Sequence, residues 1–112
     1  MKKIEAIIRK SKFDDVKDEL QRTQVNFFSY WDVTGVGNEK QNHVYRGISY
    51  STTDIQRRYL SIIVSDDFWD KTITALLKSA YTGEVGDGKI FISETTNAYR
   101  IRTSENGKKG IN

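Results

Sequence analysis

The spacing of hydrophobic and polar positions changes along the chain, and each change marks a new element. Residues 3–9 alternate, with Ile4 and Ile8 on one face, which predicts a strand. Apolar residues at helical spacing over 13–20 predict a helix. Residues 25–34 are rich in aromatic and β-branched types and predict a second strand.

The same succession returns after a long gap. Alternating apolar residues over 60–64 predict a third strand, and helical spacing over 68–80 predicts a second helix. Short strands are expected over 89–93 and 98–103. The order predicts one α+β domain over residues 1–112, with a ferredoxin-like βαββαβ sandwich.

A long loop and an uncovered sheet face complete this prediction. About residues 36–57 show no sustained period, and loops of that length in small domains are usually functional. The second and third strands carry apolar residues on both faces, for example Trp31 and Ile63, although helices are expected on one face only. We therefore expect an oligomer that covers the other face. A flexible tail is expected over about residues 104–112.

Composition excludes several classes of site. The chain has no cysteine and one histidine, which excludes disulfides, thiolate metal sites and multi-histidine metal sites. Its 18 basic residues are interspersed with 15 acidic ones, so we expect no nucleic-acid binding. No apolar run approaches the roughly 20 residues of a membrane span, and we expect a cytoplasmic protein.

Two glycine clusters can bring backbone N–H groups close to a phosphate. Gly35-Val36-Gly37 lies at the end of the second predicted strand, where a plain turn is the alternative. Residues 82–89 (TGEVGDGK) approach a P-loop pattern, but Ile90 stands where the motif needs a hydroxyl. The run also lies between a helix and a strand, the reverse of a P-loop. A P-loop NTPase is excluded, and a glycine-rich turn ending in a lysine remains.

Two arginines are the other candidate anion-binding residues. Arg100 and Arg102 alternate along the last predicted strand, so both side chains are expected to point the same way. They are either an exposed pair or a clamp for a polyphosphate, whose geometry matches the guanidinium fork. No spacing nominates a catalytic triad or an acid–base pair, and we do not expect an enzyme.

Two stretches carry a family resemblance. They are residues 45–50 (YRGISY), and residues 82–91 (TGEVGDGKIF) followed by residues 100–103 (RIRT). Together they resemble the PII family of nitrogen-regulatory signal proteins, and the similarity covers essentially the whole chain. The resemblance implies a homotrimer that binds ATP or ADP between subunits. It also implies that a long T-loop, about residues 36–57, controls a target such as an ammonium transporter, so that the protein reaches a membrane only through a partner.

The resemblance assigns residues to this expected site. The nucleotide-binding positions are Ser29, Gly35, Val36, Gly37, Asn38, Ile63, Gly86, Asp87, Gly88, Lys89, Arg100 and Arg102. Ser29 and Ile63 match positions that line the adenosine. Target docking is expected at Tyr45, Arg46, Gly47 and Tyr50. Tyr50 also matches a loop tyrosine that is uridylylated in some relatives.

Two departures from the family pattern affect the expected ligands. Glu39 stands where the family usually has a glutamine that helps to coordinate Mg²⁺ and 2-oxoglutarate, and Arg57 replaces the usual lysine at the far end of the loop. A carboxylate is a good Mg²⁺ ligand but adds negative charge beside a dianionic acid. We expect ATP or ADP binding to be kept and 2-oxoglutarate binding to be weakened or altered in its metal dependence. The alternatives are a PII-like sensor of another small molecule in carbon or bicarbonate control, and a slow ATPase that uses Glu39.

Overall fold

The computed structural model describes residues 1–36, 42–45, 48–51 and 54–111. The elements are β1 (Lys2–Ile8), the 3-10 turn η1 (Lys10–Lys12), α1 (Phe13–Arg22), β2 (Ser29–Val36), β3 (Asn42–Tyr45), β4 (Ile48–Ser51), β5 (Asp54–Val64), α2 (Trp69–Ala80), β6 (Lys89–Glu94) and α3 (Lys108–Ile111). Within the described residues, no helix is long and apolar enough to cross a membrane.

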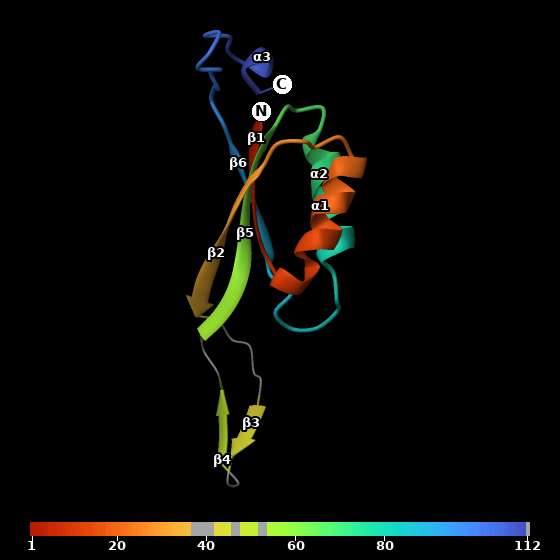
Figure 1. Ribbon diagram of the computed structural model, residues 1–112, viewed down its shortest axis with the longest axis vertical. Helices are drawn as coiled ribbons and strands as arrows, with labels where there is room; N and C mark the ends of the chain where they lie inside the picture. Colours follow the sequence, from red (N-terminus) through yellow and green to blue (C-terminus); the bar gives the residue numbers. More distant parts are fainter. Residues whose placement is uncertain (37–41, 46–47, 52–53, 112) are drawn as a thin grey trace.

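The main sheet has four strands in the order β2-β5-β1-β6, and each neighbouring pair is antiparallel. Both α1 and α2 cover the same face of this sheet (Figure 1). The order β1-α1-β2-β5-α2-β6 confirms the predicted ferredoxin-like arrangement. The sheet leaves β2 and β6 at its two edges, which separates residues that the sequence suggested would act together.

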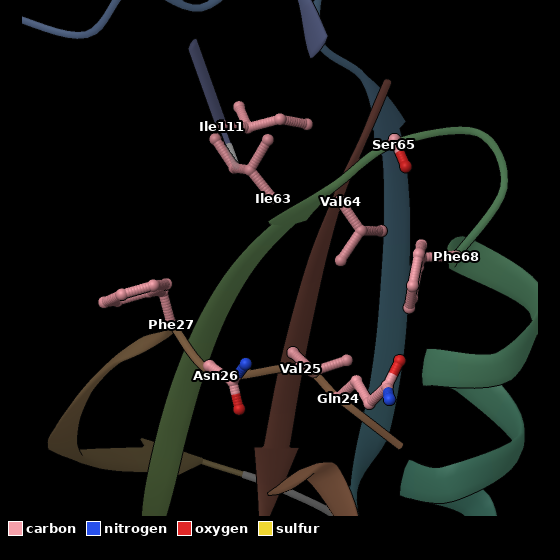
Figure 2. A pocket seen from close by; sticks show the side chains of 9 residues that line it. All are labelled: Gln24, Val25, Asn26, Phe27, Ile63, Val64, Ser65, Phe68 and Ile111. Carbon is pink, nitrogen blue, oxygen red and sulfur yellow. The ribbon is translucent and has the colours of Figure 1, made fainter. Parts of the chain in front are cut away.

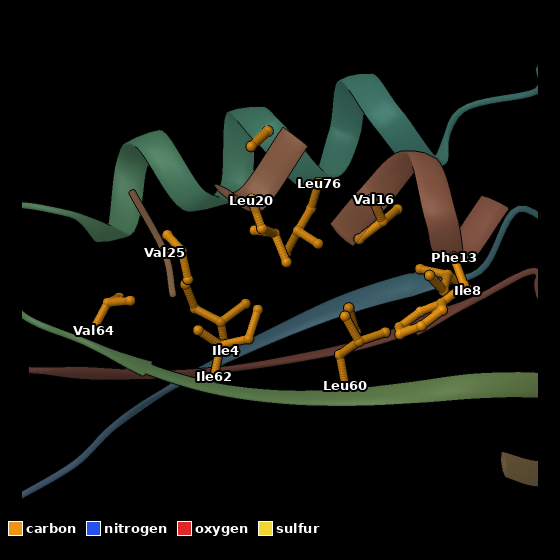
Figure 3. Packing of buried hydrophobic residues seen from close by; sticks show 12 residues of the cluster. Ile4, Ile8, Phe13, Val16, Leu20, Val25, Leu60, Ile62, Val64 and Leu76 are labelled. Carbon is orange, nitrogen blue, oxygen red and sulfur yellow. The ribbon is translucent and has the colours of Figure 1, made fainter. Parts of the chain in front are cut away.

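The core lies between the sheet and the two helices (Figure 3). Strand alternation directs every second side chain of β1 and β5 inward, and helical spacing directs one stripe of each helix toward them. The fully buried side chains include Ile4, Val16, Leu20, Leu60, Ile62, Thr72 and Leu76. The hydroxyl of Thr72 donates to the carbonyl of Phe68 at 2.8 Å, which satisfies the one polar group in this set.

The second strand begins at Ser29 rather than residue 25, because the preceding residues close α1. Gln24 adopts a left-handed conformation with φ of 69°, its N–H donates to Gln21 at 3.0 Å, and the N–H of Val25 donates to Leu20 at 2.8 Å. These are the hydrogen bonds of a Schellman motif, in which the residue after the left-handed position packs back on the helix. Val25 is accordingly buried in the core and not in a strand.

The expected loop over about residues 36–57 contains more pairing than its sequence indicated. Strands β2 and β5 stay paired out to Val36 and Asp54, and β3 pairs with β4 in a separate two-stranded sheet. This small sheet stands beyond the ends of β2 and β5, away from the two helices (Figure 1).

The predicted strand over residues 98–103 is wrong. The structure, which describes all of these residues, places 101–103 in a turn that returns the chain so that Tyr99 bridges to Asn106. The backbone N–H of Arg100 donates to the carbonyl of Glu105 at 2.8 Å, and the N–H of Ser104 donates to the carbonyl of Arg100 at 2.8 Å. These hydrogen bonds take the backbone groups that a strand would offer to its neighbour. The short helix α3 then lies in the predicted tail.

Candidate functional site

The glycine-rich turn that precedes β6 depends on its glycines for its shape. Gly83, Gly86 and Gly88 all have positive φ, of 87°, 103° and 102°. A Cβ atom on Gly88 would lie 1.7 Å from the carbonyl oxygen of Ile7, so the turn packs directly against the end of β1. Only glycine combines this backbone conformation with such a close approach.

The carboxylate of Asp87 holds the inside of this turn. Its Oδ2 accepts the backbone N–H groups of Thr82 and Gly83, both at 2.9 Å. Its Oδ1 accepts the Thr82 hydroxyl and the Nε–H of Arg9, the latter at 3.1 Å. The bonds from Thr82, and then those from Gly83 and Arg9, hold the pKa of Asp87 well below its ordinary value. Asp87, expected to hold nucleotide, is thus engaged with its own chain.

Lys89 begins β6 on the sheet face that the helices leave open. It stands opposite Ile7 in the register, while the neighbouring Ala6 and Ile8 point into the core. Its side chain is exposed. Backbone N–H groups of the turn and this ammonium group therefore lie together at one corner of the sheet, and both kinds of donor suit a phosphate.

The residues at the end of β2 form a second group at the opposite edge of the sheet. Gly35 pairs with Ile55 and Val36 with Asp54, and both Gly35 and Val36 are exposed. A Cβ on Gly35 would meet nothing within 4 Å, and its φ lies outside the left-handed region. The fold of the chain therefore does not require glycine at position 35, in contrast to Gly88.

Ser29 and Ile63 share the open face with these residues. Ser29 pairs with Ser61 and Ile63 with Lys3, on the face opposite the core. Ile63 also lines a pocket of about 190 Å³ formed by three separate segments (Figure 2). The lining residues are Gln24, Val25, Asn26, Phe27, Ile63, Val64, Ser65, Phe68 and Ile111. Phe27 is 81% exposed and was not among the expected site residues; the sequence placed it inside the second strand, whereas it lies just before β2.

Arg100 and Arg102 form the third group, beyond the other end of β6. The expectation that they alternate along a strand is wrong, because both belong to the turn that follows β6. Arg100 is half-buried, with Nη2 at 3.4 Å from the carbonyl oxygen of Lys109 and Nε at 4.0 Å from Glu105. Arg102 is exposed. The pair can still offer guanidinium groups to an anion, but from a turn.

A single chain does not bring these three groups together. Gly35 and Lys89 lie on edge strands separated by three strand spacings, roughly 14 Å at about 4.8 Å each. Lys89 begins the six-residue β6 and Arg100 lies beyond its other end, and the strand spans roughly 17 Å at about 3.3 Å per residue. A polyphosphate that contacts all three groups therefore needs a second copy of the chain.

Several expected residues lie outside the described part of the chain or on strands of the small sheet. Gly37, Asn38, Glu39, Arg46 and Gly47 are outside the described residues. The backbones of Tyr45 and Tyr50 lie in β3 and β4, opposite Ile48 and His43 respectively. Arg57, on β5, pairs with Val33 of β2, and its Nη1 donates to the carbonyl of Gln56 at 2.9 Å.

Arg9 is a second residue of this site that sequence reasoning missed. Besides its bond to Asp87, its Nη2 donates to the carbonyl of Val85 at 2.8 Å. The two partners lie 76 and 78 residues away in the sequence, and no spacing rule connects them. The turn motif indicated the fold of the turn, but the residue that ties it to β1 came only from the structure.

Comparison with known proteins gives matches over nearly the full length. The family model described as Nitrogen regulatory protein P-II matches residues 1–105. A Nitrogen regulatory protein P-II of Bradyrhizobium diazoefficiens is 39% identical over 112 residues, covering 99% of this chain and all of the relative. Nitrogen regulatory protein P-II 1 of Methanothermobacter thermautotrophicus is 38% identical over 112 residues, covering 99% and 97%. A protein of Pyropia yezoensis with the P-II name is 42% identical over 106 residues, covering 94% and 95%.

Proposed function

Because this chain belongs to the nitrogen regulatory protein P-II family, we propose that it is a cytoplasmic signalling protein that binds ATP or ADP between the subunits of a homotrimer. Its T-loop, about residues 36–57, then controls a nitrogen-metabolism target such as an ammonium transporter. The relatives are named as regulatory proteins, which supports a binding function over an enzymatic one.

The observation that carries the proposal is the separation of the three candidate groups. The three groups are the glycine-rich turn with Lys89, the end of β2 with Gly35, and the turn beyond β6 with Arg102. They present exposed donors or close backbone approach at three separate places. In a ring of copies, one surface of a subunit meets a different surface of the next. Such a contact brings the groups of two copies around one polyphosphate.

The open face of the sheet supports association between copies. Trp31, Ile63 and Phe91 remain 47%, 38% and 50% exposed on it, and the ring of Trp31 stacks on Tyr59 with centroids 4.6 Å apart. Apolar and aromatic side chains grouped on one uncovered face favour burial against another protein surface. A second and third copy of the chain provide that surface.

The described residues fit the chemistry of an adenine nucleotide. The turn supplies backbone N–H groups, and Lys89, Arg100 and Arg102 supply cationic donors for phosphate oxygens. At position 35 the chain leaves open the space that a side chain would fill, which suits close approach by a ligand. The pocket beside Ile63 and Phe27 offers an apolar and aromatic wall for the adenosine end.

The T-loop joins this site to the proposed target. It leaves the main sheet at Val36, next to Gly35, and returns at Asp54. A ligand that contacts Gly35 therefore acts at the base of the loop, and different nucleotides favour different loop conformations. We place target contacts at Tyr45, Arg46, Gly47 and Tyr50, with Tyr50 as the residue for covalent modification. Mg²⁺, where bound, is assigned to Glu39, and 2-oxoglutarate, where bound, to Glu39 and Arg57.

Two measurements test this proposal: calorimetry with ATP and ADP, and the molar mass from light scattering on protein eluted from a size-exclusion column. The unaltered protein is expected to run as a trimer and to bind both nucleotides. Gly35→Ala is expected to keep the melting temperature, since a Cβ there has free space, and to lose nucleotide affinity. Lys89→Gln should also weaken binding, whereas Lys71→Gln on the exposed side of α2 serves as the charge-matched control. A monomer, or a trimer that binds neither nucleotide, refutes the proposal.

A further inference from the structure

Arg9 reaches from the end of β1 to the glycine-rich turn and grips it at two points. Its Nε–H donates to Oδ1 of Asp87 at 3.1 Å and its Nη2 donates to the carbonyl of Val85 at 2.8 Å. The side chains of Arg9 and Asp87 are only 21% and 25% exposed. The fork of the guanidinium group thus bridges a side chain and the backbone of one turn, a geometry that a lysine cannot reproduce with a single ammonium group.

The acceptor positions of the Asp87 carboxylate are occupied by donors of its own chain. Among the described residues it accepts four hydrogen bonds, two from Thr82, one from Gly83 and one from Arg9. A carboxylate offers about four acceptor positions, so these donors use its capacity. A phosphate close to this carboxylate would also meet like charge, which is unfavourable. Asp87 is therefore poorly suited to contact the ligand that its turn is proposed to bind.

The turn needs such a restraint if it is to present its N–H groups in one arrangement. Gly86 and Gly88 on either side of Asp87 both have positive φ, and glycine has the widest conformational freedom of any residue. Ordering a free turn when a ligand binds would cost affinity, and ordering it beforehand removes that cost. The contacts of Arg9 and Asp87 order it in the folded protein.

We infer that Arg9 and Asp87 are positioning residues for the nucleotide site: they clamp the glycine-rich turn to β1, and the Asp87 carboxylate does not itself bind the nucleotide. This inference rests on the proposed function, because it assumes that the turn holds phosphate. It separates two roles within the run from Gly86 to Lys89. The backbone and Lys89 contact the ligand, and the carboxylate between the glycines holds the turn in place.

Calorimetric titration of ATP into matched variants tests this inference, because the inference and simple electrostatics predict opposite changes in affinity. Asp87→Asn removes a negative charge near the phosphates, so by electrostatics alone it would tighten binding. The clamp predicts the opposite, a loss of about tenfold, the size expected for a hydrogen bond to a charged group. Arg9→Gln should lose a similar factor, and the double variant should lose less than the product of the two single losses, because the two changes share the Arg9–Asp87 hydrogen bond.

Two further variants separate the clamp from a simple charge effect. Arg9→Lys keeps the charge but not the two-point grip, so it should bind nearly as weakly as Arg9→Gln; full affinity in Arg9→Lys would show a direct electrostatic role and overturn the inference. Lys10→Gln removes a neighbouring positive charge, which pairs with Asp32 at 3.2 Å, and should stay within about twofold of the unaltered protein. Melting temperatures of all variants are measured alongside.

The outcomes also separate this inference from the proposed function. If the unaltered protein binds no nucleotide, the proposed function fails and the clamp has no ligand to position. If the unaltered protein binds ATP and both Arg9→Gln and Asp87→Asn bind it equally well, the site stands and the clamp alone is refuted. Faster amide hydrogen exchange at Gly83 and Gly86 in Arg9→Gln, but not in Lys10→Gln, is the expected structural signature.

Discussion

The end of α1 offers a sharp test of the described backbone, because Gln24 occupies a conformation that favours glycine. Its φ of 69° lies in the left-handed region, where the Cβ of an ordinary residue crowds the following carbonyl at a cost of roughly 1–2 kcal/mol. Replacing it with glycine removes this strain but adds about 0.5–1 kcal/mol of backbone entropy to the unfolded chain. Gln24→Gly is therefore expected to stabilise the fold by about 0.5–1 kcal/mol.

The expected gain corresponds to a rise in melting temperature of roughly 2–5 °C for a chain of this length. Circular dichroism during heating, at one fixed protein concentration so that association does not shift the midpoint, measures it directly. The matched control is Gln21→Gly, the same chemical change in the helical turn just before. Gln21 is exposed and helical, so glycine there should lower the free energy of unfolding by about 0.5–1 kcal/mol.

The opposite signs of these two changes are the essential result. Gln24 and Gln21 are both exposed, so lost packing affects the two variants alike and only the backbone conformation differs. If Gln24→Gly destabilises the protein as much as Gln21→Gly does, residue 24 is not left-handed and the Schellman end of α1 is wrong.

Three further changes test other parts of the molecule. Ile62→Ala removes a fully buried side chain from the middle of the sheet and should lower the free energy of unfolding by roughly 2–5 kcal/mol in a denaturant titration. Gly88→Ala should abolish nucleotide binding and lower the melting temperature, because its Cβ would lie 1.7 Å from the carbonyl oxygen of Ile7; an unchanged melting temperature would refute the close approach. The folded-state pKa of Asp87 lies below its ordinary 3.8, so its contribution to stability is present above pH 4 and is lost as the pH falls further. Asp87→Asn should therefore be less stable than the unaltered protein at pH 7, and the difference should shrink in acid, as followed by melting temperature against pH.

Local pattern predicted the elements whose residues face one core. The alternation of Ile4, Ala6 and Ile8 and the helical spacing of Val16 and Leu20 both match buried positions in the structure. Burial on one face imposes a period on the sequence, and that period is readable without knowledge of the partner element. The order of elements then sufficed for the sheet topology, because few arrangements accommodate two βαβ units.

The segments that the sequence mispredicted are those whose backbone hydrogen bonds are made locally, without a periodic pattern of buried side chains. Residues 25–28 are apolar enough for a strand, but Val25 packs back on the end of α1. The turn after Arg100 is held by hydrogen bonds between backbone groups a few residues apart. Composition alone does not distinguish such closures from an edge strand, because both expose one side of the chain to solvent.

The candidate site shows the same division. Glycines and cationic residues in a recognisable spacing are the signal for the proposed turn and Lys89, since these residue types suit phosphate contact. The assignment of Asp87 to the ligand came from the family resemblance, and the structure adds that its carboxylate points toward Thr82, Gly83 and Arg9. A contact over 78 residues depends on the sheet that brings β1 beside β6, so no local pattern contains it.

The placement of the candidate groups also has a consequence for assembly. If each nucleotide contacts the β2 edge of one copy and the turn before β6 of the next, binding and association share the same interface. The nucleotide then stabilises the trimer by the free energy with which it binds the assembled form. Because Gly35 is followed directly by the residues that enter the T-loop, the same contact biases the loop. Under the proposed function, one ligand would therefore act on both the assembly and the surface presented to a target.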